Sequence, residues 1–460
     1  MKKTIQTFFI TVAGILLLQS CNNSRKTDGN TILFKNVRLI DGNGGQPVEN
    51  MRILIQGDTI AGIGADLDTA SATQVIDLNG KTVMPAMISA HVHIGTLKGT
   101  TTAADHYTRE NILAQLQKYL DYGVSIIQVM GTDRPMLFES GLRDSSLNGQ
   151  LPGARLYSAG YGFNVPNGPS PALSSGKDYL FRPSMASQVP AQIDSLAKIK
   201  ASVVKIWQDK FGGDAKPMSP AVFKAIIDQA HQHKLRVAAH VYYLSDARDL
   251  IDNDVDIIGH SIRDSVISDA LIQEMKQKKV VYIPTLALDE FSFIYGSKPD
   301  WLDDPFFKAS LEPGVLAMIT APGYEQEVRN SQGYTRNKAG FEIALKNLKK
   351  LYDAGILVAM GTDSGATPLR AQGFSEHLEL ELMVQAGLTP LQAIGTATKN
   401  SAIAMQLEKR YGTLEKGKVA DLIILSGNPV EDIKNTRKIE AVYKAGKKAS
   451  SGPLSNSNAQ

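Results

Sequence analysis

Both ends of the chain carry short runs in which hydrophobic and polar residues alternate. Between residues 31 and 83, such runs are separated by turn residues, for example Asp41-Gly42-Asn43-Gly44-Gly45. Near the other end, the run Asp421–Leu425 precedes the turn Gly427-Asn428-Pro429. Strands broken by glycine, asparagine and aspartate are typical of a small antiparallel sheet. We therefore predict a sheet at each end of the chain.

The middle of the chain has a different pattern, because short hydrophobic runs alternate there with amphipathic helical segments. This alternation predicts βα units and a parallel sheet. One helix is predicted to start at Ser219-Pro220, and another to end at Ala354-Gly355. Eight such runs favour a closed (β/α)₈ barrel over an open sheet: Met87–His93, Val124–Met130, Ala154–Ala159, Val203–Trp207, Arg236–Val241, Asp256–His260, Val280–Thr285 and Ile356–Gly361.

Two stretches between the runs are longer than ordinary loops. Tyr161–Pro190 is rich in glycine, proline and serine, and Asp289–Gly340 carries many aromatic residues. Long insertions after barrel strands usually cover the mouth of the active site. We expect these two stretches to determine substrate preference.

Composition excludes several classes of protein. The 460 residues are 43% hydrophobic and 21% charged, as in an ordinary globular protein. The balance of 49 basic and 46 acidic residues gives a net charge of +3, so we expect no nucleic-acid partner. The single cysteine, Cys21, excludes an intrachain disulfide and a cysteine-ligated zinc site.

The first residues are predicted to form a targeting segment. Lys2 and Lys3 precede an apolar run, Phe8–Leu18, that is too short to span a bilayer comfortably. The run ends in Leu18-Gln19-Ser20-Cys21, which resembles a bacterial lipobox. We predict a lipoprotein signal peptide over residues 1–20, a lipidated Cys21 and a tether over residues 21–30. The protein would then be exported and membrane-anchored, at the periplasm or cell surface; a plain secretory signal is the alternative.

Residues suited to metal binding recur at the ends of the predicted strands. His91 and His93 form His-Val-His, and residues i and i+2 of a strand point to the same side. In a parallel barrel all strand C-termini open on one face, so groups at these positions converge. The set comprises His91, His93, Lys205, His240, His260 and Asp363.

The pattern resembles the metal-dependent amidohydrolase superfamily, within its imidazolonepropionase-like group that includes prolidase-like enzymes. The segment from Pro85 to His93 is similar to the family's first-strand motif, and Tyr411–Asp421 is similar to its closing segment. The segment from Glu376-His377 through Ala386–Pro390, together with Ala397-Thr398, resembles its post-barrel helices. The resemblance implies a TIM barrel over residues 85–404, a small β-sandwich built from residues 31–84 and 405–450, and a tail over residues 451–460.

The resemblance also implies roles for the strand-end residues. His91, His93 and Asp363 would hold one divalent metal ion and His240 and His260 a second, with zinc the expected metal. Lys205 matches a lysine that CO₂ carboxylates in binuclear members, although a lysine at a strand edge can also extend to water. Its apolar neighbours would lower the pKa of the amine and so supply the neutral nucleophile that carbamate formation needs.

The same resemblance implies how the reaction would proceed. A metal-bridging hydroxide would attack a carbonyl, and Asp363 would move the proton to the leaving amine. Tyr242 matches a tyrosine that stabilises the oxyanion, while the adjacent Tyr243 leaves open that either ring serves in packing. Arg263-Asp264, just past His260, could meet a substrate carboxylate or form a local ion pair.

Three functional hypotheses follow. The leading one is a binuclear hydrolase that cleaves the amide bond of a small substrate, such as a dipeptide or an N-acyl amino acid. The second is a mononuclear cyclic-amide hydrolase of the imidazolonepropionase kind, against which Lys205 argues. The third is a non-catalytic binding lipoprotein on the same scaffold, which we would expect to have lost a ligand. The oligomeric state is not predicted.

Overall fold

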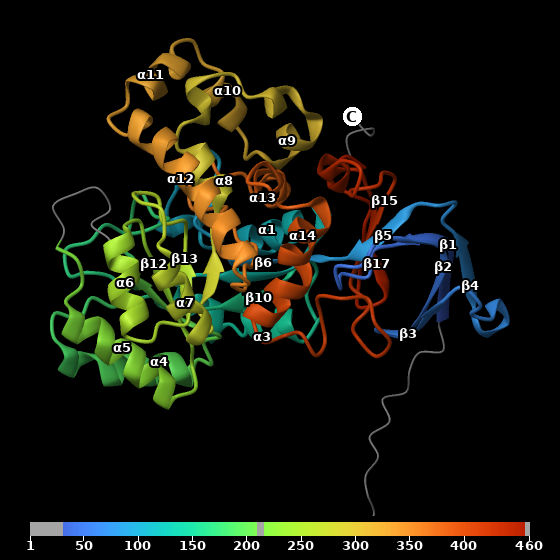
Figure 1. Ribbon diagram of the computed structural model, residues 1–460, viewed down its shortest axis with the longest axis horizontal. Helices are drawn as coiled ribbons and strands as arrows, with labels where there is room; N and C mark the ends of the chain where they lie inside the picture. The colour runs from blue at the N-terminus through green and yellow to red at the C-terminus, as the bar shows by residue number, and fades with distance from the viewer. Residues whose placement is uncertain (1–30, 209–215, 456–460) are drawn as a thin grey trace, which may run out of the picture.

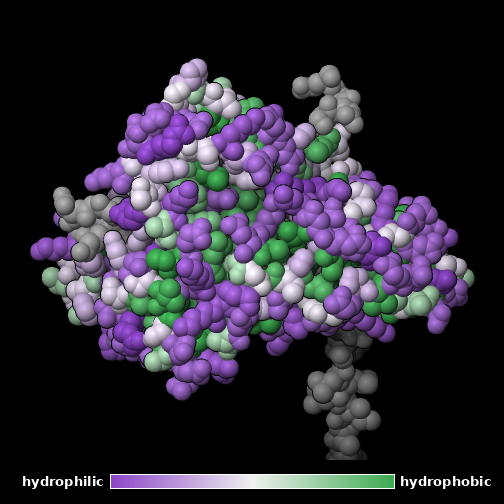
Figure 2. Space-filling view, turned by 45° about the horizontal axis from the view of Figure 1, so that its top comes forward, coloured by the Kyte–Doolittle hydropathy of each residue, from purple (hydrophilic) through white to green (hydrophobic). Residues whose placement is uncertain are grey.

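The computed structural model describes residues 31–208 and 216–455. The predicted signal peptide, Cys21, the tether and residues 456–460 of the predicted tail lie outside the described residues. Within the described ranges, no helix is long and apolar enough to cross a membrane. The face drawn in Figure 2 is mainly hydrophilic, with hydrophobic residues in small groups.

Strands from both ends of the described chain form one sheet of eight strands, seen on the right of Figure 1. Its order is β17-β16-β15-β5-β1-β2-β3, and β4 also pairs with β1. The buried face includes Phe34, Ile53, Leu422 and Ile424. The strands are β1 (Thr31–Leu39), β2 (Val48–Gln56), β3 (Thr59–Gly64), β4 (Gln74–Asp77), β5 (Thr82–Pro85), β15 (Leu422–Leu425), β16 (Ile439–Lys444) and β17 (Lys447–Ser450).

The sheet that the sequence predicts to be antiparallel is mixed. β1 runs parallel to β4 and to β5, whereas its pairing with β2 is antiparallel. Two antiparallel steps, β1 to β2 and β2 to β3, leave β3 running in the direction of β1, and the chain then crosses back beside β1 in that same direction. All eight strands are hydrogen-bonded as one sheet, so the division into a two-layered sandwich stays a prediction.

Parallel strands coincide with seven of the eight predicted runs. β6, β9 and β10 form one parallel sheet, and β11 to β14 form another. Single parallel bridges link the ends of these sheets, from Phe163 to Ile206, from Tyr282 to Val358 and from Val92 to Ser364. The strands are β6 (Met87–Val92), β9 (Val124–Val129), β10 (Arg155–Ser158), β11 (Val204–Trp207), β12 (Val237–His240), β13 (Ile257–Gly259) and β14 (Val281–Ile283).

The eighth run, Ile356–Gly361, is an extended segment with one bridge rather than a strand. Tyr282 bonds to both Leu357 and Ala359, as it would in a ladder. The Met360 N–H, however, donates to the carbonyl of Thr396 in the following helix, while the Ala90 N–H donates to the Met360 carbonyl. The contact with the helix competes with the ladder and interrupts it. The arrangement of the parallel strands and helices as a whole is TIM-barrel-like.

Helices cover the parallel strands, and their ends agree with the sequence signals. Helix α5 begins at Pro220 after Ser219, and α12 ends before Ala354, followed by Gly355 at a φ of 82°. The helices are α1 (Arg109–Asp121), α2 (Pro135–Glu139), α3 (Leu142–Leu147), α4 (Val189–Lys198), α5 (Pro220–Gln232), α6 (Leu244–Asp252), α7 (Asp269–Gln277), α8 (Leu286–Phe291), α9 (Pro305–Ser310), α10 (Val315–Ile319), α11 (Tyr324–Asn330), α12 (Tyr334–Asp353), α13 (Phe374–Gln385), α14 (Pro390–Gly395), the π-helical η6 (Thr396–Asn400) and α15 (Ser401–Ala404).

The two long insertions differ in structure. The segment 161–190 is mostly irregular, whereas 289–340 folds into α9, α10, α11 and the start of α12, at the top of Figure 1. Aromatic contacts hold the second insertion together; the Trp301 ring lies 4.7 Å from that of Phe307 and 5.2 Å from that of Phe374 in α13. The insertion is therefore a packed helical unit anchored on the barrel helices.

A buried ion pair joins the mixed sheet to the parallel strands, and we predict that it contributes strongly to stability. Arg155, at the start of β10, pairs with Asp421, and the two side chains are only 5% and 6% exposed. Because Asp421→Asn would leave the guanidinium buried without its counter-charge, we expect the free energy of unfolding to fall by about 3 to 5 kcal/mol. Urea unfolding would measure the change.

Asp66→Asn provides the control for this prediction, since Asp66 is exposed. We expect this variant to unfold within about 0.5 kcal/mol of the parent chain. Equal stability of the two variants would show that the buried pair has no special role.

Candidate metal centre

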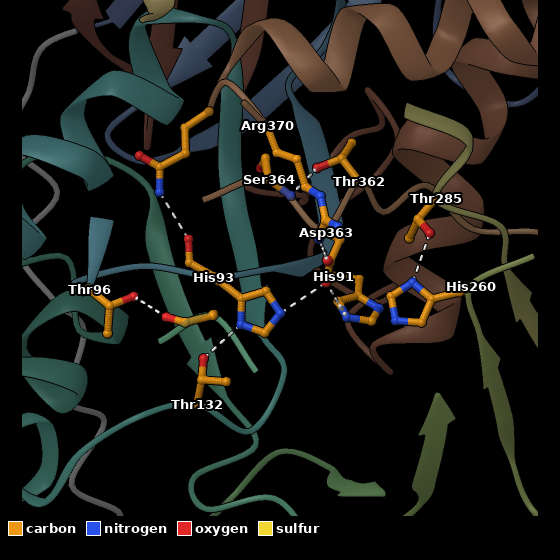
Figure 3. A network of polar contacts seen from close by, with 12 residues as sticks. His91, His93, Thr96, Thr132, His260, Thr285, Thr362, Asp363, Ser364 and Arg370 are labelled. Carbon is orange, nitrogen blue, oxygen red and sulfur yellow. Dashed lines mark hydrogen bonds and ion pairs between the residues drawn. The ribbon is translucent and has the colours of Figure 1, made fainter. Parts of the chain in front are cut away.

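His91, His93 and Asp363 meet at one end of the parallel strands (Figure 3). His91 lies in β6 and His93 directly follows it, so the alternation of the strand turns both rings to the same side. Oδ1 of Asp363 lies 3.2 Å from His91 Nε2 and 2.9 Å from His93 Nε2. One potential ligand atom from each of the three residues falls within 4.8 Å of the others.

His240 and His260 extend this cluster. His240 ends β12, and His260 follows β13, its neighbour in the sheet. The His240 and His260 ring centroids are 4.3 Å apart, and those of His91 and His260 are 4.6 Å apart. The predicted histidines therefore form one continuous group.

Hydroxyl groups orient two of the imidazoles. Thr132 Oγ1 lies 2.7 Å from His93 Nδ1, and Thr285 Oγ1 lies 2.9 Å from His260 Nδ1. A hydrogen bond at one ring nitrogen fixes the direction of the other, which is how metal-binding histidines are usually held. Thr285 closes a predicted strand, but the sequence carried no signal for its contact with His260.

The backbone is strained at the same place. His260, Thr285 and Asp363 have φ values of 74°, 53° and 57°, in the left-handed region that is unfavourable for residues other than glycine. Such strain persists where the surrounding structure fixes it, and it is common at functional sites.

Lys205, in β11, is fully buried beside the histidines. A methyl group built on Gly259 would contact Lys205 Nζ and His91 Cε1, each at 3.5 Å, so the amine lies near the imidazole. Among the described residues, Nζ has no hydrogen-bond partner. Burial lowers the pKa of the Lys205 amine to about 7, and the nearby Asp363 opposes this shift.

Burial and neighbouring charges also determine the protonation of the other groups. Burial, followed by the charge of Lys205, lowers the pKa of His91 to about 3. Burial and the neighbouring His240 and His91 lower the pKa of His260 well below its usual value. Burial alone would raise the pKa of Asp363, but His93 and Arg370 lower it well below its usual range. These directions favour neutral imidazoles and an ionised carboxylate, which are the forms that bind metals.

A buried glutamate supports the segment that carries Asp363. Oε1 of Glu376 accepts hydrogen bonds from Thr362 at 2.7 Å, Ser364 at 2.9 Å and Ser89 at 3.1 Å. Its Oε2 accepts from the N–H of Gly373 at 2.9 Å. Glu376 thus ties α13 to both residues that flank Asp363. In the sequence, Glu376 stood out only as part of a motif, and its contacts with the residues that flank Asp363 were not predicted.

The cluster opens into a cavity of about 380 Å³. Tyr242 lines it between two guanidinium groups, with Arg263 Cζ at 4.6 Å and Arg336 Cζ at 5.6 Å from its ring centroid. Tyr243 packs against Tyr242 at 4.8 Å between ring centroids, outside the described residues that line the cavity.

The hypothesis of a local ion pair between Arg263 and Asp264 was wrong. Arg263 Nη1 lies 2.5 Å from Asp289 Oδ1, and Asp264 instead accepts a hydrogen bond from the N–H of Leu244 at 2.8 Å. Sequence reasoning also missed Arg370, which pairs with Asp363 Oδ2. In the sequence, Arg263 and Arg370 stand out only as charges that follow predicted strands. Asp289 stands out only as a charge at the start of a long insertion.

The residues present suit a divalent metal ion. Within the described part of the chain, Nδ1 of the buried His91 makes no hydrogen bond, whereas its Nε2 lies against Asp363 Oδ1. Buried polar atoms without partners are costly, and imidazole with carboxylate is a donor set used by zinc and other divalent metals. His91, His93 and Asp363 could therefore hold a metal ion.

Comparison with known proteins agrees with this chemistry. Ochratoxinase from Aspergillus niger is 24% identical, over 91% of this chain and 86% of that enzyme. Imidazolonepropionase from Deinococcus radiodurans is 23% identical, over 87% of this chain and 92% of that enzyme. The crystal structure of a putative prolidase from Bifidobacterium longum is 25% identical, with a TM-score of 0.71 over 91% of this chain and 94% of that one.

The family match covers most of the chain, since residues 82–449 match the sequence model described as "Amidohydrolase family". Members of this family typically bind divalent metals, as the cluster of histidine and aspartate would require. The chain belongs to the amidohydrolase family and is a hydrolase that acts on carbon–nitrogen bonds.

Proposed function

We propose that this enzyme hydrolyses the amide bond of a dipeptide or an N-acyl amino acid with the help of two divalent metal ions. The observation that carries the proposal is the meeting of four histidines, a buried lysine and an aspartate on the parallel strands, where His93, His240, His260 and Asp363 line one cavity. The similarity to a putative prolidase supports the choice of substrate.

In this proposal, His91, His93 and Asp363 hold one ion, and His240 and His260 hold the other, with zinc the expected metal. Lys205 would carry a carbamate that bridges the two: its Nζ adds to the carbon of CO₂ and loses one proton. Full burial beside His91, with no hydrogen-bond partner for Nζ among the described residues, supports this assignment. A carbamate would give the buried group partners that the free amine does not have.

The chain's own residues would then carry out the proton transfers. When bound, the metal lowers the pKa of water and polarises the substrate carbonyl. Asp363 accepts the proton of the attacking water and delivers it to the leaving nitrogen, as the new C–O bond replaces the C–N bond. Tyr242 donates a hydrogen bond to the developing oxyanion from the cavity wall. Glu376 and Arg370 hold Asp363 in place for these steps.

A mononuclear cyclic-amide hydrolase is the second candidate. Only His91, His93 and Asp363 meet the ligand spacing for a single ion among the described residues, and imidazolonepropionase is a relative. The buried Lys205 favours the binuclear proposal instead.

Two further proposals rest on the sequence patterns. The parallel strands would close as a (β/α)₈ barrel over residues 85–404, and the mixed sheet would fold as a sandwich from residues 31–84 and 405–450. The chain would be exported and anchored through a lipidated Cys21.

Hydrolysis of a substrate panel tests the main proposal. We expect the purified chain to release amines from dipeptides or N-acyl amino acids, to lose this activity when the metal is removed by dipicolinate, and to regain it with Zn²⁺. Hydantoin serves as the cyclic amide in the panel. Turnover of hydantoin alone would contradict the choice of a linear amide as substrate, and metal content with and without bicarbonate would separate one bound ion from two.

A further inference from the structure

One cationic group at the cavity is left over after the ion pairs are assigned. Within the described ranges, three arginines line the cavity: Arg263, Arg336 and Arg370. Arg263 pairs with Asp289, and Arg370 pairs with Asp363. Among the described residues, Arg336 has no ion pair and no hydrogen bond, and its guanidinium lies over the ring of Tyr242. Arg336 is exposed, so its guanidinium is accessible from solvent.

The position of Arg336 is set by the close packing of α12. A methyl group built on Gly340 would lie 3.3 Å from the Arg263 carbonyl oxygen and 3.6 Å from the Tyr242 hydroxyl, so the helix lies directly against both residues. Arg336 is one turn before Gly340, and residues four apart share one face of a helix. The same face therefore presents Arg336 to the cavity beside Tyr242.

The charges of the cavity favour an anionic ligand. Among the described residues that line the cavity, the two carboxylates, Asp289 and Asp363, are each matched by an arginine, which leaves the charge of Arg336 in excess. Bound divalent metal would add further positive charge beside it. A neutral amide or urea would not compensate this charge, whereas a carboxylate can accept two parallel hydrogen bonds from a guanidinium.

We propose that Arg336 binds the free carboxylate of the amino-acid portion of the substrate and thereby selects acids over neutral amides. This inference rests on the proposed function, because it deepens the choice of a dipeptide or N-acyl amino acid. Arg336 would be a specificity-determining residue contributed by the helical insertion. The scissile amide would lie between Arg336 at the mouth and the histidine cluster at the base.

Binding of a matched pair of inert ligands tests the inference separately from turnover. The probe 4-oxo-4-phenylbutanoate is N-benzoylglycine with a methylene in place of the amide nitrogen, so it holds no C–N bond to hydrolyse. Its neutral partner, 1-phenylpentane-1,4-dione, has a methyl ketone in place of the carboxylate. We expect the zinc-loaded parent chain to bind the acid roughly 10- to 100-fold more tightly than the dione by calorimetry.

Arg336→Met should reduce this preference to near parity, and Arg336→Lys should keep part of it. Lys338→Met is the matched control, because Lys338 is an exposed cation on the same helix that does not line the cavity. It should bind both probes as the parent does. A parent chain without preference for the acid, or a preference that survives Arg336→Met, would overturn the inference.

Hydrolysis of N-benzoylglycine itself reports on the proposed function. A chain that prefers the acid probe through Arg336 but cleaves neither N-acyl amino acids nor dipeptides would refute the proposed function and leave carboxylate recognition supported. Cleavage of N-benzoylglycine by a chain that binds the two probes equally would support the proposed function and refute carboxylate recognition by Arg336.

Discussion

Changing Asp363 to asparagine is expected to lower kcat/KM by about 10³-fold or more while the fold remains intact. The amide has the shape of the carboxylate but cannot accept the proton of the attacking water. It also removes the negative charge that lies between His91, His93 and Arg370. Steady-state kinetics on a dipeptide would measure the loss, and elemental analysis would show reduced metal content.

Asp264→Asn is the matched control for this variant. Asp264 is an exposed aspartate that follows β13 at the same end of the strands, and it accepts a hydrogen bond from the Leu244 N–H. We expect it to keep activity within about twofold of the parent, since exposed substitutions change stability little. Activity of Asp363→Asn within tenfold of the parent would rule out Asp363 as the proton carrier.

Changing Lys205 to alanine should lower the metal content from about two ions to about one per chain, because the proposed bridge between the two sites is lost. Activity should fall by at least about 100-fold, because loss of a residue that only supports a metal ligand can already cost about that much. In the parent chain, depletion of bicarbonate should reduce metal content in the same way, and its return should restore it. Elemental analysis with and without bicarbonate measures both effects.

Lys444→Ala controls for the loss of a partly buried lysine away from the site. Burial lowers the pKa of Lys444 to about 8, and Nζ donates to the carbonyl of Leu151 at 3.1 Å. Its removal should leave metal content unchanged. About one metal per parent chain, with no response to bicarbonate or to Lys205→Ala, would favour the mononuclear alternative.

Much of the candidate site could be predicted from the sequence, because the positions of its histidines follow from strand periodicity and parallel strand pairing. His91 and His93 are two residues apart on one strand, and His240 and His260 end neighbouring strands, so strand periodicity and parallel pairing bring them together. The same rule located Lys205, whose place in a buried strand follows from its apolar neighbours.

Contacts made by loops and insertions could not be predicted in this way. The partner of Arg263 proved to be Asp289, at the start of the helical insertion, rather than the adjacent Asp264. The pairing of Arg370 with Asp363 depends on how the intervening loop turns, and no periodic pattern records that path. The mixed character of the sheet was missed for the same reason. β4 and β5 lie parallel to β1 because of how the chain connects in three dimensions, which local patterns do not record.

The sheet that combines both ends of the chain has a consequence for folding. β5 pairs with β15, with Val83 opposite Ile424, so this ladder joins residues about three quarters of the chain length apart. Contacts of such high contact order form slowly, because a long loop must close before they give any stabilisation. During synthesis the N-terminal strands emerge long before their partners, with one edge of β5 unpaired. The order of synthesis thus leaves an aggregation-prone edge open until the last strands arrive.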